Sequence, residues 1–283
     1  MEGLHASIKL FPSPSDKNWI ARVDFTVAQH IEDPLYRAIF ERTTNRKAYS
    51  KAALTQEQKA EILSSSYEVV SGSIKLVEDE NKIKELSGPI SLNEQLIFEN
   101  RHLHDFFYDH VHWTKEEDEK FRNGFFIDTL ELNPPQRMAM KLMRSWRIAS
   151  FAKKLGISRQ VARDNAKNYT TASAFGVVVM QTNNADDYVL AGRIMERVWL
   201  KVTNMGLSLQ PMTGVLFFNQ RILANKAEAF SSDQIASIRQ AYEKIKQGFD
   251  INSETIAMLF RLGKGGEPSA RSLRFNLDDF IKK

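Results

Sequence analysis

Cysteine is absent from the 283 residues of this chain. This absence excludes disulfides, thiolate nucleophiles, iron–sulfur clusters and zinc sites built on cysteine, and it fits a reducing compartment. No stretch approaches the ~20 apolar residues that a membrane helix needs. The N-terminus also lacks the basic segment followed by an apolar run that marks a signal peptide. We therefore expect a cytoplasmic protein without a membrane partner.

The chain also has no large excess of charge of either sign. The chain has 39 basic and 35 acidic residues, for a net charge of +4, and no five like charges occur in a row. A nucleic-acid partner is therefore not indicated. The sequence has no P-loop, Gly-x-Gly-x-x-Gly or Gly-x-Ser-x-Gly motif, and the glycine-rich stretch at 263–266 lacks the following helix that a phosphate-binding loop needs.

The hydrophobic content of 42% is that of a globular protein. We predict one domain over 1–283, with a β-hairpin at about 5–28 and a helical insertion at about 92–167 interrupted at 133–135. Because the chain opens on a strand, it could be the C-terminal part of a longer protein. The expected strands are 67–77, 175–180 and 256–262; the expected helices run from Pro34 through Phe40, then over 55–63, 79–86, 186–205 and 232–246. This mixed order predicts an α+β fold.

Three short segments far apart in the sequence carry the chemistry. The first collects fixed cations and hydroxyls, the second offers a glycine amide that no side chain blocks, and the third is again cationic. Guanidinium forks suit a phosphate or an electron-rich ring edge, and glycine permits close approach of the backbone. The segments contain Arg42, Thr43, Thr44 and Arg46; Pro211, Met212, Thr213 and Gly214; and Arg271 and Arg274.

Together with Gly192, Gly206 and Pro268, these segments resemble the flavin-binding segments of the nitroreductase superfamily, in a divergent branch whose helical insertion covers the flavin. The resemblance implies a nitroreductase-like α+β fold, with a mixed, mainly antiparallel central sheet flanked by helices and an intertwined homodimer that holds FMN between its subunits. It implies phosphate or ribityl contacts for Arg42 and Thr44, the pyrimidine edge for Arg46, and amides facing N5 for Thr213 and Gly214. Arg274, with Arg271 beside it, would bind the phosphate.

The implied function is that of an FMN-binding oxidoreductase. It would reduce a small electron acceptor, a nitro compound or a quinone, with NADH or NADPH by ping-pong hydride transfer. Flavin N5 carries the hydride, so no catalytic side chain is expected. Family members place an asparagine where this chain has Ser64, Ser65 and Ser66. A flavin-binding or sequestering protein with little turnover is the alternative.

Taken singly, each segment also has an ordinary interpretation. Arg42 and Arg46 would be stabilised by the dipole at a helix C-terminus, residues 211–214 could form a turn, and Arg271 and Arg274 could be solvated charges.

Two further patterns compete. Residues 151–164 resemble a helix-turn-helix, with Ser158 capping a recognition helix that carries Arg159, Gln160 and Arg163, so DNA binding is a third and weaker hypothesis. The histidines at 102, 104, 110 and 112 flank Phe106, Phe107 and Tyr108, which favours a packed aromatic helix over a metal site. No metal is expected.

Overall fold

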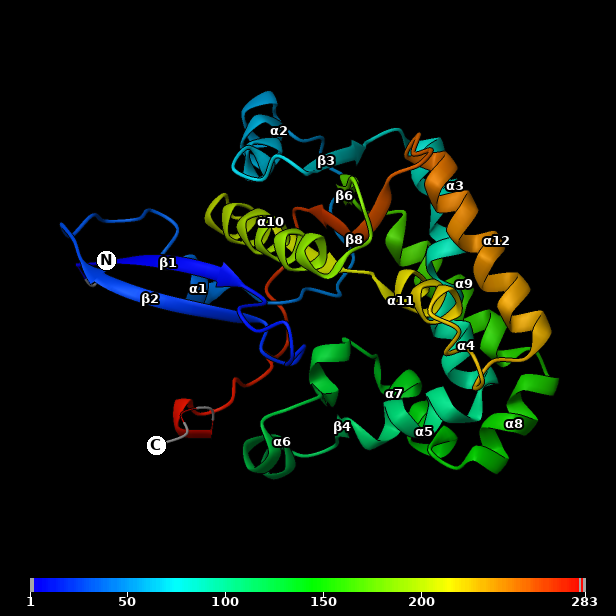
Figure 1. The fold of residues 1–283 in the computed structure, drawn as a ribbon. Helices are drawn as coiled ribbons and strands as arrows, with labels where there is room; N and C mark the ends of the chain where they lie inside the picture. Colours follow the sequence, from blue (N-terminus) through cyan, green and yellow to red (C-terminus); the bar gives the residue numbers. More distant parts are fainter. Residues whose placement is uncertain (1–2, 280, 282–283) are drawn as a thin grey trace.

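A four-stranded antiparallel sheet forms the centre of the molecule. The computed structural model describes residues 3–279 and 281 (Figure 1). The strands lie in the order β3-β6-β8-β7, and each neighbouring pair is antiparallel. Together with the helices around it, this sheet makes the fold α+β, as predicted. The bounds are Gly72–Val77 for β3, Ala174–Met180 for β6, Thr255–Gly263 for β8 and Ser208–Pro211 for β7.

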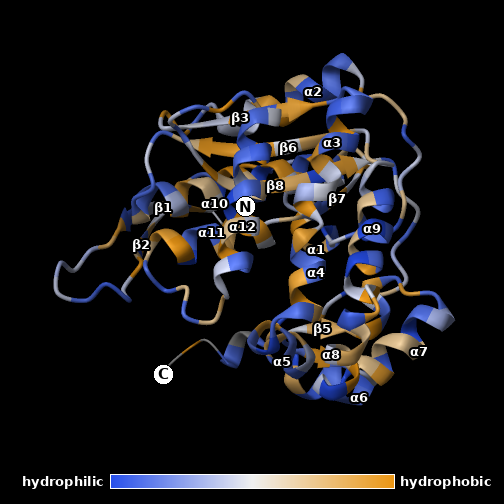
Figure 2. Ribbon diagram, turned by 90° about the vertical axis from the view of Figure 1, so that its right-hand side faces the viewer, coloured by the Kyte–Doolittle hydropathy of each residue, from blue (hydrophilic) through white to orange (hydrophobic). Residues whose placement is uncertain are grey.

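Strand β6 confirms the prediction of a buried central strand. Every residue of β6 is buried, and the hydropathy colours of Figure 2 show it as largely apolar. Because successive side chains of a strand point to opposite faces, Phe175 and Val177 join one apolar cluster, whereas Ala174 and Val178 join another. The sheet therefore has a hydrophobic core on each face.

One face is covered by α10 (Ala185–Asn204) and α2 (Gln56–Leu63). The predicted capping box at the start of α2 is present, because Thr55 and Gln58 exchange side-chain and backbone hydrogen bonds. Gly206 follows α10 with a φ of 68°, in the left-handed conformation expected for the residue that ends this helix.

The other face is covered by α3 (Glu80–Ile90), α11 (Gly214–Leu223) and α12 (Ser232–Gly248). Asp79 caps α3, and Ser231 forms a capping box with Gln234. Neither β7 nor α11 was predicted. Strand β7 has only four residues. Helix α11 is also short, and its sequence lacks the polar face that marks a surface helix.

A helical layer with its own apolar cluster lies beside this sandwich, below the sheet in Figure 1. It includes two residue pairs in strand conformation, β4 (Val111–His112) and β5 (Phe125–Phe126), and a short 3₁₀ helix at Ile127–Leu130. Asn133 caps α7 ahead of its two prolines, at the interruption that the sequence indicated. The helices are α4 (Leu92–Glu99), α5 (Arg101–Asp109), α6 (Lys115–Phe121), α7 (Pro134–Met143), α8 (Trp146–Lys154) and α9 (Ile157–Tyr169).

The N-terminal segment forms a two-stranded hairpin of β1 (Leu4–Leu10) and β2 (Ala21–Val27), which stands to one side of the body in Figure 1. Helix α1 (Ala38–Glu41) is a single α-helical turn. The helix predicted from Pro34 is therefore too long, because the backbone before Ala38 forms i to i+3 turns such as Tyr36 N–H to Asp33 C=O.

The strand predicted over 67–77 is likewise shorter and begins at Gly72. A 3₁₀ helix at Ser64–Ser66 continues into turns, which leave Tyr67 and Val70 exposed. The other predicted elements agree with the structure within a few residues. No helix in the described part of the chain has both the length and the apolarity to cross a membrane.

Candidate cofactor site

The first predicted segment leaves α1 and runs beside β7. Thr44 forms a parallel bridge with Leu209, and the Asn45 N–H donates to the Leu209 carbonyl at 3.0 Å. This parallel contact makes the strand pairing around the sheet mixed. It also brings the first segment alongside the strand that leads directly into the second.

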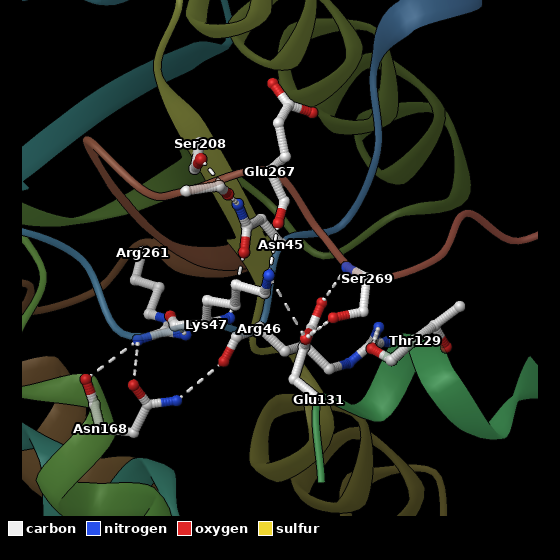
Figure 3. A network of polar contacts seen from close by, with 11 residues as sticks. Asn45, Arg46, Lys47, Thr129, Glu131, Asn168, Ser208, Arg261, Glu267 and Ser269 are labelled. Carbon is white, nitrogen blue, oxygen red and sulfur yellow. Dashed lines mark hydrogen bonds and ion pairs between the residues drawn. The ribbon is translucent and has the colours of Figure 1, made fainter. Parts of the chain in front are cut away.

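Asn45 ties three parts of the chain together, as Figure 3 shows. Its side chain is buried, and Nδ2 donates to Ser208 Oγ at 2.9 Å and to the Gly266 carbonyl at 2.7 Å. The same side chain accepts from the Lys47 N–H at 3.0 Å. The first segment, β7 and the loop after β8 are therefore joined by one amide group.

The C-terminal tail returns to the start of the first segment. Arg274 donates from its guanidinium to the carbonyl of Ile39, and Arg271 Nη1 lies 3.4 Å from the carbonyl of Phe40. Both arginines are exposed. The tail thus meets the chain at the end of α1, immediately before Arg42, so the first and third segments lie together.

Arg42 and Arg46 point to different parts of the protein. Arg42 Nε pairs with Glu196 of α10 at 2.7 Å, and its guanidinium lies 4.9 Å from the centre of the Trp199 ring. Trp199 also donates to the Thr43 carbonyl at 3.4 Å. Arg46 Nη1 donates to the Thr129 carbonyl of the insertion at 3.0 Å, and burial lowers the pKa of Arg46.

The second segment is a junction from strand to helix rather than an isolated turn. Pro211 ends β7, the buried Met212 donates its N–H to Leu259 at 2.8 Å, and Thr213 precedes α11 without a side-chain cap. Gly214 begins α11 under Asn93 of α4. A Cβ atom at Gly214 would lie 2.1 Å from Asn93 Oδ1, so this close approach requires glycine.

A buried arginine that sequence reasoning did not select lies beneath these segments. Arg261, in the middle of β8, is fully buried. It donates to Gln210 Oε1 at 2.8 Å. It also donates to the Lys47 carbonyl at 2.9 Å and to the Asn168 carbonyl at 3.0 Å, and Figure 3 shows Arg261 beside Asn168. Asn168 in turn donates to the Arg46 carbonyl at 2.8 Å. A signal was present in the sequence, because Arg261 interrupts an otherwise apolar strand.

Two tyrosines and a carboxylate complete this buried network. The Arg261 guanidinium lies 4.3 Å from the Tyr49 ring centre and 5.3 Å from that of Tyr169. Tyr169 donates to Glu94 Oε1 at 2.8 Å, and Tyr49 donates to the Asn45 carbonyl at 2.8 Å. Burial raises the pKa of Tyr49 to about 12. This network therefore fixes the backbone of the first segment, β7 and the end of α9 relative to one another.

Glu94 is the acidic member of the network. As a residue it is partly exposed, but its Oε2 atom is enclosed and has no hydrogen-bond partner. Burial raises the pKa of Glu94, against the opposing effects of the Tyr169 hydroxyl and the Arg261 charge. Burial also lowers the pKa of Arg261 and raises that of Tyr169. Glu94 and Arg261 are thus opposite charges linked through Tyr169.

The donor set around α1 fits a phosphate group. Among the described ion pairs, those made by Arg42, Arg46, Arg271 and Arg274 involve one carboxylate, that of Glu196. Arg42, Arg271 and Arg274 gather at the end of α1, and only Arg42 has a carboxylate partner among the described ion pairs. Their excess of positive charge is one that a phosphate dianion would balance. Arg46 points away from this group, toward Thr129 of the insertion. A ligand has less room at Gly214, because Asn93 occupies the space in front of this residue. A planar ring there would have to contact or displace the Asn93 amide.

Two surface clefts lie elsewhere. One, of about 540 Å³, opens between α5, α8 and α12 and is lined by Asn100, Lys153 and Gln234 among others. The other, of about 510 Å³, lies between α10 and the segment after the hairpin, at Pro34 and Lys201. None of the ten predicted cofactor-binding residues lines either cleft.

The segment predicted to resemble a helix-turn-helix does contain two consecutive helices, but not the predicted N-terminal cap. Helices α8 and α9 flank Gly156, yet α9 begins at Ile157, so the prediction that Ser158 caps the second helix is wrong. Ser158 is buried and donates to Glu99 Oε1 at 2.6 Å. The first turn of α9 is therefore packed against α4 through Ser158, whereas Arg159, Gln160 and Arg163 are exposed.

The histidine-rich segment forms helix α5 as far as Asp109, as its aromatic residues predicted, whereas His112 lies in β4. His104 is buried, with Nε2 placed 2.8 Å from the Met143 carbonyl and its ring beside Trp146. His112 is also buried and pairs with Asp118 at 3.1 Å. Among the described residues, no three histidine, aspartate or glutamate side chains gather in a way that could hold a metal ion.

The chain has relatives of low similarity. No family model matches it. It is 20% identical over 245 residues to the uncharacterized protein MT1398 of Mycobacterium tuberculosis (strain CDC 1551 / Oshkosh), a match that includes 85% of this chain and 33% of the relative. The chain thus spans about a third of the length of this curated relative.

Several solved structures, some of them of nitroreductases, are similar to this chain over most of its length. A nitroreductase with bound FMN from Bacteroides fragilis matches with a TM-score of 0.48 and 10% identity, covering 89% of this chain and 99% of the other. A second, also with bound FMN, from Desulfitobacterium hafniense, gives 0.46 and 9% over 89% and 99%. NfrA2 of B. megaterium gives 0.46 and 11% over 89% and 74%. Because the sequence identities are this low, the role of each residue of this chain is inferred from its own contacts.

Proposed function

We propose that this protein is an FMN-binding oxidoreductase that works as a homodimer. It would take electrons from NADH or NADPH and pass them to a small acceptor, a nitro compound or a quinone, in a ping-pong reaction. The observation that carries the proposal is the convergence of three segments that are spread over more than 230 residues of the chain. The Asn45 amide joins the first segment to β7, which leads into the second, and Arg271 and Arg274 bring the third to the end of α1.

The arginines near α1 supply the phosphate-binding part of the proposal. Arg271 and Arg274 are exposed and contact only backbone carbonyls in the described contacts, and Arg42 is 28% exposed in its side chain. Such contacts contribute little to stability, so they can be exchanged for a phosphate at low cost. Charge-assisted hydrogen bonds to a phosphate are the stronger interaction.

The remaining predicted residues would orient the flavin ring. When bound, FMN supplies the hydride chemistry through N5. Gly214 would present its backbone amide at the N-terminus of α11, where the helix dipole favours electron-rich atoms. Arg46, held by Thr129 of the insertion, would bring a cation to the pyrimidine edge. Neither residue needs to gain or lose a proton for these roles.

A visible spectrum and a flavin titration test the cofactor assignment. We expect the purified protein to absorb near 450 nm, and the double variant Arg42→Ala/Arg274→Ala to lose FMN. Arg159→Ala is the matched control, because Arg159 is an exposed arginine on α9, outside the three segments. Full retention of FMN by the double variant would contradict the proposed phosphate site.

A flavin-holding protein with little turnover is the second candidate. The observation that favours it is the close cover that the insertion provides: Asn93 lies directly over Gly214, and Thr129 binds Arg46. Anaerobic addition of NADPH, and separately of NADH, distinguishes the two functions. Rapid loss of the flavin absorbance supports an enzyme, whereas an unchanged spectrum in both experiments supports a holding protein.

A further inference from the structure

The N-terminal hairpin has one face made entirely of apolar residues. In an antiparallel pair, residues directly opposite each other lie on the same face. The register places Leu4 opposite Val27, and it places the other members of this face in pairs as Ala6 with Phe25, Ile8 with Val23, and Leu10 with Ala21. The alternate pairs are polar, namely His5 with Thr26, Ser7 with Asp24, and Lys9 with Arg22. We call the first set the hairpin apolar face.

This face is not covered by the described part of the chain. Val27 is 92% exposed and Phe25 is 64% exposed, and only Leu10 and Ala21 of the fourteen strand residues are partly buried. None of the hairpin residues belongs to the apolar clusters of the body. In Figure 1 the hairpin projects away from the sheet and the insertion.

Such a face has a strong tendency to be buried. An isolated two-stranded hairpin is marginally stable in water, and an amphipathic antiparallel sheet normally packs its apolar side on a core. The strict alternation in both strands fixes the register, since a slip of one residue would turn the apolar set to the opposite face. Alternation of this kind is expected where one face of a sheet is in contact with another apolar surface.

We propose that this surface is the hairpin apolar face of a second copy of the chain. The face carries no charged or hydrogen-bonding side chain, so its partner must be equally apolar and free of charge. The same face on another copy meets both conditions, and a two-fold axis lets each hairpin cover the other. Two hairpins packed face to face would form a small sandwich with sheets ~10 Å apart.

The available area is consistent with a reversible dimer. Seven residues per strand and two strands give a face roughly 23 Å long and 10 Å wide. With side-chain relief, this corresponds to about 500 Å² of accessible surface on each copy, or about 1,000 Å² in total, which is near the lower limit for a specific interface. The exposed Ile31, in the segment after the hairpin, could add to it. The inference rests on the homodimer of the proposed function and adds to it the surface through which the two copies associate.

Sedimentation of the full-length chain tests the interface. The expected mass of the wild type is twice 32.5 kDa. Phe25→Glu should raise the dimer dissociation constant at least tenfold, whereas Thr26→Glu, the same charge on the adjacent residue of the polar face, should leave it unchanged. Far-UV circular dichroism should be nearly the same for all three proteins. A monomeric wild type would overturn this proposal together with the homodimer of the proposed function. A Phe25→Glu variant as dimeric as the wild type would overturn the hairpin interface alone.

Cysteine cross-linking gives a second measurement, which does not depend on destabilising the hairpin. Because the chain has no cysteine, Val23→Cys and Asp24→Cys each introduce a single thiol, one on the apolar face and one on the polar face. A short bismaleimide should link Val23→Cys into dimers and leave Asp24→Cys mostly unlinked. Equal yields from the two variants, or no dimer from Val23→Cys, would show that something other than a second hairpin covers this face, or that nothing does.

Discussion

Arg261 and Arg274 lie only a short distance apart in the sequence, but the protein uses them differently. Arg261 is fully buried and donates to three fixed oxygens from different parts of the chain. Arg274 is exposed and reaches a carbonyl at the end of α1. Arg271 behaves as Arg274 does. One arginine therefore belongs to the framework, and the other two lie on the surface of the candidate site.

This difference indicates how a site can bind an anion without a change in the fold. Removing a buried donor leaves buried acceptors without partners, which is costly. Removing a surface donor leaves a carbonyl that water can satisfy. The framework arginine thus sets the positions of Lys47, Asn168 and Gln210, whereas the surface arginines can change partners without disturbing the fold.

Replacing Arg261 should have the largest effect. Arg261→Met keeps much of the side-chain length but removes all the donors, leaving Gln210 Oε1 and the carbonyls of Lys47 and Asn168 without partners. We expect the free energy of unfolding to fall by about 3–5 kcal/mol, measured by urea denaturation. Arg159→Met is the control for an exposed arginine and should change stability by less than ~0.5 kcal/mol. A loss below about 1 kcal/mol for Arg261→Met would mean that the network is not part of the framework.

Closing the space at Gly214 should have the next largest effect. Gly214→Ala would place a methyl group 2.1 Å from Asn93 Oδ1, and such overpacking costs about 1–3 kcal/mol. Gly192→Ala is the matched control, since nothing lies within 4 Å of a Cβ there and alanine favours a helix over glycine. Thermal unfolding of both variants measures the difference. Adding Asn93→Ala removes the Oδ1 and Cγ contacts but keeps the Asn93 Cβ, 2.8 Å from the new methyl group, so it should restore part of the stability that Gly214→Ala loses. No restoration at all would place the strain elsewhere.

The sequence predicts the regular parts of this fold better than its junctions. Buried strand β6 and the capping box of α2 follow from local patterns, and both are found as expected. The short strand β7 and helix α11 were not predicted, although they carry the second segment. Arg261 was missed because its partners, such as Lys47 and Gln210, are distant in sequence. The candidate residues come from motifs, but their mutual positions depend on tertiary contacts that no local pattern encodes.

The titration of Glu94 should produce a smaller effect that depends on pH. Burial raises the pKa of Glu94 above its ordinary value of 4.5, so the folded protein holds this proton more tightly than the unfolded chain. The contribution of this proton to the free energy of unfolding is therefore fully present below pH ~4.5, and it is lost as the pH rises through the raised pKa of Glu94. Glu94→Gln keeps an acceptor for Tyr169 and removes the charge, so its stability should decrease less over this range. Urea denaturation at several pH values tests this, and parallel curves for the two proteins would contradict it.

Replacing Arg271 should have the smallest effect on stability and is the sharpest probe of its role. The side chain is exposed, and its contact with the Phe40 carbonyl is long, at 3.4 Å. Arg271→Ala should therefore change the free energy of unfolding by less than ~0.5 kcal/mol. Loss of one charge-assisted contact to a phosphate should nevertheless weaken FMN binding by about tenfold, measured by quenching of flavin fluorescence. Arg22→Ala, which removes an exposed arginine of the hairpin paired with Asp24, should change neither quantity. If Arg271→Ala lowers stability by more than 1 kcal/mol, the tail is part of the framework, and the contrast between Arg261 and the surface arginines no longer holds.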